Sequence, residues 1–176
     1  MSLIDNIHAR KVHTCVIGLG YVGLPLALEF IRAGYKVTGL DIGASRVAQL
    51  RAGISYVPDI TDENIRESLS TGRFEVTADS AVLSEVQTVS ICVPTPLRKT
   101  GDPDLSLVKS ALNDIVNNRR PGQLYILEST TYPGTTEEVL LAALSEGEGK
   151  VGKDYYLAFS PERVDPGNPR YNTRNI

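Results

Sequence analysis

The chain has few of the residues that build metal centres or disulfide frameworks. Its 176 residues include two histidines, two cysteines and no tryptophan. The two histidines, His8 and His13, both lie near the N-terminus, so neither a histidine-rich metal site nor a histidine acid–base centre is expected, and we predict no metal ligands. Cys15 and Cys92 are too few for a disulfide framework, which fits a reducing compartment.

Basic blocks and long apolar runs are also missing. Lysine and arginine number 18 against 21 acidic residues, giving a net charge of −3, so a nucleic-acid partner is not expected. No apolar run approaches the roughly 20 residues that span a bilayer, so we expect no membrane association. Residues 1–11 carry no long apolar segment of the kind found in signal peptides, and a cytoplasmic location is expected.

The chain does contain an alternation of short apolar runs with helical patterns. The runs predict strands at 12–18, 36–41, 86–93, 124–128 and 155–159, with a short strand-like stretch around Val76. The patterns predict helices at 21–33, 45–52, 62–71, 104–117 and 135–144. Alternation of this kind is typical of βαβ units, so we predict an α/β fold, a Rossmann-type doubly wound parallel sheet with helices on both faces.

Three local features refine the helices. Leu24, Leu28 and Ile31 recur on one face of the first, which should face the core. Ser45 is the expected N-cap of the second. Leu107, Ala111 and Ile115 are expected to form the buried stripe of the helix at 104–117.

The order of these elements predicts the domain organisation. Residues 1–11 are expected to be an N-terminal extension, and residues 12–160 a single dinucleotide-binding domain. Pro161, Pro166 and Pro169 fall within nine residues, so 161–176 is expected to be an exit loop or linker.

A glycine-rich turn follows the first expected strand and opens the first helix. It reads Gly-Leu-Gly-Tyr-Val-Gly over residues 18–23, the G-x-G-x-x-G pattern. Gly18 would permit the tight turn, Gly20 would let the backbone approach a pyrophosphate, and Gly23 would let helix and strand pack closely. The helix N-terminus offers free N–H groups to the phosphates, so Tyr21 and Val22 also fall in the predicted cofactor site.

An acidic residue ends the second expected strand. Asp41 can accept hydrogen bonds from the adenosine ribose hydroxyls and would repel a 2′-phosphate, which favours NAD over NADP. Arg46 allows several roles: it could bind a 2′-phosphate, lie over the adenine, pair with Asp41, or simply be solvated.

Four ordered motifs carry a resemblance to a known family. They are Val16–Pro25 (VIGLGYVGLP), Cys92–Pro96 (CVPTP), Glu128–Thr136 (ESTTYPGTT) and Ser160–Arg163 (SPER). Together they resemble the N-terminal half of the UDP-glucose/GDP-mannose dehydrogenase family, and the resemblance covers nearly the whole chain from Val12. Residues 160–168 are most similar to the branch that acts on UDP-N-acetylhexosamines.

The resemblance implies an activity for the full-length protein. Members of the family oxidise the C6 alcohol of a nucleotide sugar to a carboxylate with two NAD⁺ and one water, through a thioester on a cysteine in the second half of the sequence. By resemblance, the substrate is a UDP-sugar such as UDP-N-acetylglucosamine or UDP-N-acetylmannosamine, and the full-length enzyme is a homodimer. A surface-polysaccharide precursor is the implied product class. The chain by itself is expected to bind the cofactor and to turn over nothing.

The resemblance also assigns roles to residues at the strand ends. The loop of Val93, Pro94 and Thr95 would pass along the cofactor. Ser129 and Thr130 would lie near the nicotinamide, with Thr130 holding a water. Glu162 would be the general base that activates water or relays a proton, and would also contact the cofactor.

Several plainer interpretations stay open. Thr130 could cap the following helix, Glu162 could be a surface acid paired with Arg163, and the prolines could merely stiffen a turn. Cys15 and Cys92 lie in apolar strands and are expected to be core residues, not nucleophiles. Tyr132 replaces the small apolar residue usual in the family, which leaves the geometry of its loop open.

Two other functions remain in competition. One is a β-hydroxyacid dehydrogenase of the 6-phosphogluconate type, against which the Pro-Thr-Pro and Ser-Pro-Glu-Arg motifs argue. The other is a non-catalytic regulatory module whose function ends at binding the dinucleotide.

Overall fold

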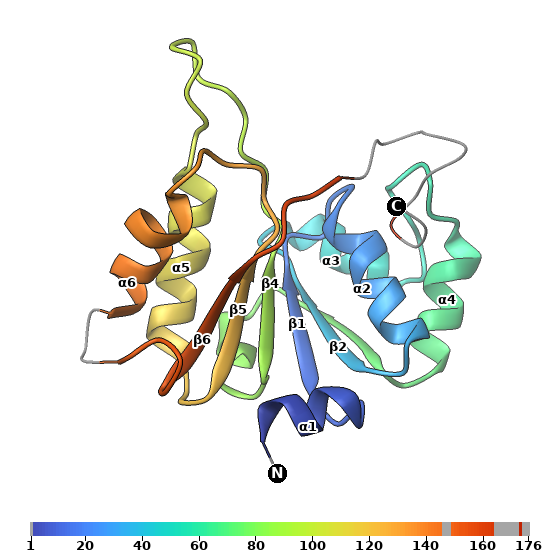
Figure 1. Ribbon diagram of the computed structural model, residues 1–176. Helices are drawn as coiled ribbons and strands as arrows, with labels where there is room; N and C mark the ends of the chain where they lie inside the picture. Colours follow the sequence, from blue (N-terminus) through green and yellow to red (C-terminus); the bar gives the residue numbers. More distant parts are fainter. Residues whose placement is uncertain (1, 146–148, 164–172, 174–176) are drawn as a thin grey trace.

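A single parallel sheet organises the molecule. The computed structural model describes residues 2–145, 149–163 and 173. Within them the sheet has the strand order β3-β2-β1-β4-β5-β6, with every neighbouring pair parallel. The strands are β1 (His13–Ile17), β2 (Lys36–Leu40), β3 (Phe74–Thr77), β4 (Thr88–Ile91), β5 (Gln123–Leu127) and β6 (Tyr155–Phe159). The predicted doubly wound α/β fold is confirmed (Figure 1).

Helices cover both faces of the sheet. They are α1 (Leu3–His8), α2 (Gly23–Arg32), α3 (Ala44–Arg51), α4 (Asp62–Ser70), α5 (Ser106–Asn118) and α6 (Ala142–Ser145), with a 3₁₀ turn η1 (Ser80–Ser84) and a π-helical segment η2 (Thr136–Leu141). In Figure 1, α2, α3 and α4 lie to the right of the strands and α5 and α6 lie to the left. None of the helices in the described ranges is long and apolar enough to cross a membrane.

Two hydrophobic clusters hold these layers together. One joins α2, α3 and α4 to β1, β2 and β3, and the other joins η1, α5, η2 and α6 to the opposite face. β1 contributes to both, because alternate side chains of a strand point to opposite faces: Val16 enters the first cluster, Cys15 and Ile17 the second. The predicted stripe of the first helix is confirmed, since Leu24, Leu28 and Ile31 are all buried.

The N-cap of α3 was predicted wrongly. α3 begins at Ala44 after the N-cap Gly43, so Ser45 is an exposed helical residue and not the cap. Asp41 explains this start, because its Oδ1 accepts a hydrogen bond from the N–H of Gly43 (2.8 Å), which places the N-cap two residues before Ser45.

The buried face of α5 also differs from the expectation. Its buried side chains are Val108, Ala111, Leu112 and Ile115. Leu107 is only partly buried and lines a cavity instead.

The start of α2 differs as well. The predicted helix at 21–33 begins at Gly23, two residues later than expected.

The N-terminal residues form a helix that the sequence pattern did not suggest. α1 starts with a capping box in which Ser2 and Asp5 bond each other's backbone N–H. The hydroxyl of Tyr35 donates to the carbonyl of Ile7 (3.0 Å), which ties α1 to the end of α2.

At the other terminus, most of the predicted exit loop, residues 164–172 and 174–176, lies outside the described residues.

Candidate functional site: a dinucleotide cleft at the carboxyl edge of the sheet

The carboxyl ends of the strands meet at one edge, because all six are parallel. Two adjoining cavities open there. The large cavity, about 650 Å³, is lined by residues that include Gly20, Arg46, Thr95, Glu128 and Glu162. The small cavity, about 220 Å³, is lined by residues that include Gly18, Asp41, Ile42, Ala78 and Leu107. Both share Gly20, Arg46, Val93 and Pro94, so they form one continuous cleft over the glycine turn.

The three glycines of the turn have three different surroundings. Gly18 has a φ of +88°, and a Cβ there would lie 2.7 Å from the carbonyl oxygen of Cys92. A Cβ on Gly23 would lie 1.9 Å from the carbonyl oxygen of Gly18, so only glycine lets α2 approach β1 this closely. A Cβ on Gly20 would meet nothing within 4 Å, which leaves its backbone open to the cleft. These environments match the separate roles expected from the motif.

The peptide groups of Leu19, at the centre of this turn, are held from two sides. The Leu19 N–H donates to Oδ2 of Asp41 (2.9 Å), and its carbonyl accepts from the hydroxyl of Tyr56 (2.7 Å). Asp41 is 4% exposed, and its other oxygen accepts from Gly43. Burial, and then the nearby Asp41 charge, raises the pKa of Tyr56 to about 12, so its hydroxyl stays a donor at neutral pH. The turn is therefore fixed before any ligand arrives.

Arg46 spans the boundary between the two cavities. Its Nη1 lies 3.7 Å from Oδ2 of Asp41, and its guanidinium carbon lies 5.7 Å from the ring centroid of Tyr56. Of the open alternatives, pairing with Asp41 is therefore realised. The side chain is still 55% exposed, so some of its N–H groups remain available to a ligand in the cleft.

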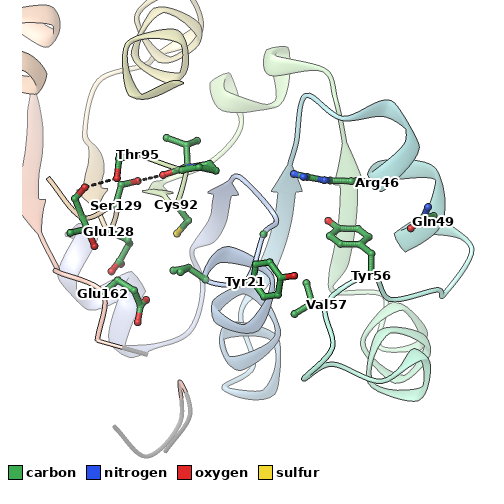
Figure 2. A pocket seen from close by; sticks show the side chains of 15 residues that line it. Tyr21, Arg46, Gln49, Tyr56, Val57, Cys92, Thr95, Glu128, Ser129 and Glu162 are labelled. Atoms are coloured by element: carbon green, nitrogen blue, oxygen red, sulfur yellow. Dashed lines mark hydrogen bonds between the residues drawn. The ribbon is translucent and has the colours of Figure 1, made fainter. Parts of the chain in front are cut away.

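On the far side of the glycine turn, the loops after β4 and β5 are bonded to each other. Thr95 Oγ1 donates to the carbonyl of Thr130 (2.5 Å), and Ser129 Oγ donates to the carbonyl of Val93 (2.8 Å), as Figure 2 shows. The single protons of both hydroxyls are thus used within the protein, and towards a ligand each can only accept. Thr130 itself is exposed and lines the large cavity. It does not cap the following helix, whose N-cap is Thr135.

Two glutamates stand at the end of this side. The N–H of Glu162 donates to the carbonyl of Glu128 (3.3 Å), which continues the β5–β6 pairing past the strands and brings both residues to the cavity wall. Glu128 is half-buried, and this burial raises its pKa; the charge of Glu162 adds to the rise. A hydrogen bond from the hydroxyl of Ser160 lowers the same pKa, and the nearby hydroxyl of Ser90 lowers it to a smaller extent.

The two cysteines are buried, as predicted: Cys15 lies in β1, and Cys92 directly follows β4. Cys15 is fully buried and Cys92 is 7% exposed. Burial raises the pKa of the Cys15 thiol to about 12. Burial, followed by the charges of Glu128 and Glu162, holds the pKa of Cys92 well above its ordinary value. Neither thiol is suited to act as a nucleophile, because the reactive form is the thiolate.

The structure brings the predicted site together. Every predicted cofactor residue except Gly23 lines one or both cavities, and Gly23 lies beneath the turn. Residues that the sequence reasoning missed are Gln49, Tyr56 and Glu128 in the large cavity and Ile42, Ala78, Ser110 and Asp114 in the small one. Glu128 had a signal, because it follows a buried strand directly. Tyr56 lies in an irregular loop and had none.

Comparison with known proteins agrees with this geometry. Residues 12–176 match the model of the "UDP-glucose/GDP-mannose dehydrogenase family, NAD binding domain". The chain is 34% identical to UDP-N-acetyl-D-glucosamine 6-dehydrogenase of Salmonella typhi, over 94% of this chain and 38% of that protein. It is 39% identical to UDP-N-acetyl-D-mannosamine dehydrogenase of Pyrococcus horikoshii, over 86% of this chain and 36% of that protein.

A solved structure shows the same fold. The UDP-N-acetylmannosamine dehydrogenase structure from Pyrococcus horikoshii superposes with a TM-score of 0.82 at 38% identity, covering 88% of this chain and 37% of that one. The chain therefore spans less than two fifths of the length of the relatives it matches.

Proposed function

This chain belongs to the UDP-glucose/GDP-mannose dehydrogenase family, of which it forms the NAD-binding domain, and we propose that it serves an NAD-dependent UDP-sugar 6-dehydrogenase. The observation that carries the proposal is the cleft itself, which runs from Asp41 and Arg46 across the glycine turn to Thr130 and Glu162. The named activities of the relatives support a UDP-N-acetylhexosamine as substrate.

We propose one orientation for a dinucleotide in the cleft. The adenosine would occupy the small cavity between the apolar side chains of Ile42 and Leu107, with its ribose hydroxyls on Asp41. The pyrophosphate would lie over Gly20 and the N-terminus of α2, where N–H groups point outward. The nicotinamide would lie in the large cavity beside Thr95, Thr130 and Glu162, with Val22, Val93, Pro94 and Ser129 along its path.

The residues at the nicotinamide end would handle protons and water. NAD⁺, when bound, supplies the hydride acceptor. Oxidation of an alcohol to a carboxylate takes up two NAD⁺ and one water and gives two NADH and three protons. We assign Thr130 to holding the water and Glu162 to accepting a proton from it. Cys15 and Cys92 are buried, so a thiol nucleophile would have to come from elsewhere in the enzyme.

We extend the proposal to organisation and partners. Residues 12–160 would form the cofactor domain, 1–11 an extension, and 161–176 a connection toward the substrate-binding part. The full enzyme would bind a UDP-sugar, act as a homodimer and work in the cytoplasm. The family membership favours this over the hydroxyacid-dehydrogenase alternative.

Calorimetry on this chain tests the cofactor part. NADH should bind, and NADPH should bind at least roughly tenfold more weakly, because its 2′-phosphate would meet the Asp41 carboxylate. Equal affinity for both, or no binding, would contradict the proposal.

Steady-state assays of the full-length protein test the substrate. UDP-N-acetylglucosamine or UDP-N-acetylmannosamine should yield two NADH per sugar. Oxidation of hydroxyacids would instead support the alternative enzyme class, and cofactor binding without any turnover would support a regulatory module.

A further inference from the structure

Glu128 stands at the end of the cleft that would hold the nicotinamide. It follows β5 directly and lines the large cavity together with Thr95, Thr130 and Glu162. In Figure 2, Glu128 and Glu162 lie on one side of the cavity, and Arg46 and Tyr56 lie on the other, with Tyr21 between them. Arg46 is the one cationic side chain among the described residues that line this cavity. This cation is already paired with Asp41, and the two glutamates lie at the opposite end.

The partners of Glu128 do not neutralise its charge. The hydroxyl of Ser160 stabilises the carboxylate, and the hydroxyl of Ser90 lies near it, but neither adds a positive charge. Ser90 is 1% exposed, and its Oγ makes no hydrogen bond of ordinary geometry within the described residues; its approach to Glu128 has the smallest of the effects on that pKa. Across the described part of the chain, no ion pair includes Glu128.

A carboxylate in this position acts differently on the two redox forms of the cofactor. The nicotinamide ring of NAD⁺ carries a positive charge, and the dihydronicotinamide ring of NADH is neutral. A half-buried negative charge beside the ring attracts the first and leaves the second nearly unaffected, and partial exclusion of water strengthens the difference.

We propose that Glu128 makes this site discriminate between the redox forms of the cofactor, favouring NAD⁺ over NADH by the charge it places at the nicotinamide end. The inference rests on the proposed function, since it requires the nicotinamide to lie in the large cavity.

The discrimination has a use in a two-step oxidation. Each sugar would require two hydride transfers at a single cofactor site, so the first NADH has to leave and a second NAD⁺ has to enter before the sequence is complete. A charge that favours NAD⁺ drives this exchange in the forward direction. Glu128 is then a specificity-determining residue for the oxidised cofactor, alongside the proton-handling role assigned to Glu162.

Isothermal titration calorimetry on this chain tests the inference with three ligands: NAD⁺, NADH and ADP-ribose, which lacks the nicotinamide. The measurements use about pH 8.5, where ionised carboxylates are favoured. In Glu128→Gln, the ratio Kd(NADH)/Kd(NAD⁺) should fall roughly fivefold, mainly through weaker NAD⁺ binding. The Kd of ADP-ribose should not change.

Two control variants bracket the effect. Glu67→Gln removes the same charge from an exposed position on α4 and should leave the ratio at the wild-type value. Glu128→Asp keeps a charge in place and should retain most of the preference. Should Glu128→Gln fail to bind ADP-ribose, Glu128→Ala is measured instead, with the same expected fall in the ratio.

The outcomes are distinct. An unchanged ratio in a variant that still binds ADP-ribose overturns the role of Glu128 and leaves the cofactor function intact. Equal weakening of all three ligands also overturns it, because that pattern indicates a purely structural residue. Failure of the wild-type chain to bind NAD⁺, NADH and ADP-ribose overturns the proposed function together with this inference.

Discussion

The two ends of the cleft surround their carboxylates differently. We call the end at β1 and β2 the binding end, and the end at β5 and β6 the chemical end. At the end formed by β1 and β2, both oxygens of Asp41 accept backbone N–H groups, and the peptide groups of Leu19 are bonded on both sides. At the end formed by β5 and β6, burial and the neighbouring Glu162 charge raise the pKa of Glu128. The first arrangement is stable without a ligand, and the second holds a charge in surroundings that disfavour it.

The difference suits the two ends to different tasks, one to binding the cofactor and the other to chemistry at the nicotinamide. A fixed, fully bonded turn costs little reorganisation when a pyrophosphate arrives, so it favours affinity. A raised pKa is common among carboxylates that move protons or interact with a charge that changes during the reaction. Substitutions at the two ends should therefore affect stability with opposite signs, and four predictions test this, beginning with the largest effect.

Gly23→Ala should be the most damaging change at the binding end. Its Cβ would lie 1.9 Å from the Gly18 carbonyl oxygen, so α2 would have to move away from β1. We expect a loss of about 3 kcal/mol or more in the free energy of unfolding, with loss of NADH binding. Urea denaturation and calorimetry measure both. Gly20→Ala is the matched control: its Cβ meets nothing, so the fold should persist while NADH binding weakens. Equal destabilisation by both would contradict the assigned roles.

Asp41→Ala should cause the second largest loss of stability. It leaves the N–H groups of Leu19 and Gly43 without their acceptor, which should cost about 2 to 3 kcal/mol of stability and at least roughly tenfold in NADH affinity. Asp41→Asn keeps one acceptor oxygen and should lose less stability. If denaturation curves for both variants overlay the wild type, the turn does not depend on Asp41.

Tyr56→Phe should produce a smaller loss in the same direction. It removes the hydroxyl that donates to the Leu19 carbonyl, for an expected cost of about 1 kcal/mol and a modest loss of NADH affinity. Tyr156→Phe removes a hydroxyl from an exposed ring on β6 and should change neither quantity. A Tyr56→Phe variant with wild-type affinity would show that the turn is held by Asp41 alone.

Glu128→Gln should have the smallest effect on stability, and of opposite sign. An acid whose folded-state pKa is raised destabilises the fold when it ionises. This penalty is absent below the ordinary pKa, grows as pH rises from the ordinary to the folded-state pKa, and is constant above it. At neutral pH the variant should melt about one or two degrees higher than the wild type, and the difference should vanish at acidic pH. Thermal melts across pH measure it, and a lower melting temperature at neutral pH would contradict the contrast between the two ends.

The binding end was largely predictable, and the chemical end was not. Gly18, Gly20, Gly23 and Asp41 have roles that follow from backbone geometry and charge at fixed spacing, so the motif alone located them. The position of Glu128 after a buried strand is visible in the sequence, but its burial and its proximity to Glu162, 34 positions later, are not. Thr130 and Glu162 were assigned by resemblance, and their roles remain predictions.

The errors in the predicted helices also come from hydrogen bonds that the sequence pattern does not show. Ser45 has the right chemistry for an N-cap, yet Asp41 bonds Gly43 and starts the helix earlier. α1 has six residues, too few for a hydrophobic period to be visible, and it is held by a long-range bond from Tyr35. The first of these bonds joins residues two positions apart and the second joins residues 28 positions apart, and neither is visible in the hydrophobic periodicity of the sequence.

β1 contributes to both hydrophobic clusters and leads directly into the glycine turn. A bound dinucleotide would therefore attach at the point where the two cores share a strand, touching loops from both halves of the sheet. Its binding energy would be distributed over the whole domain, and the amide protons of α4 and of α6 would gain protection from exchange together. Occupancy of the cleft would thus set the cooperativity of unfolding as well as its midpoint.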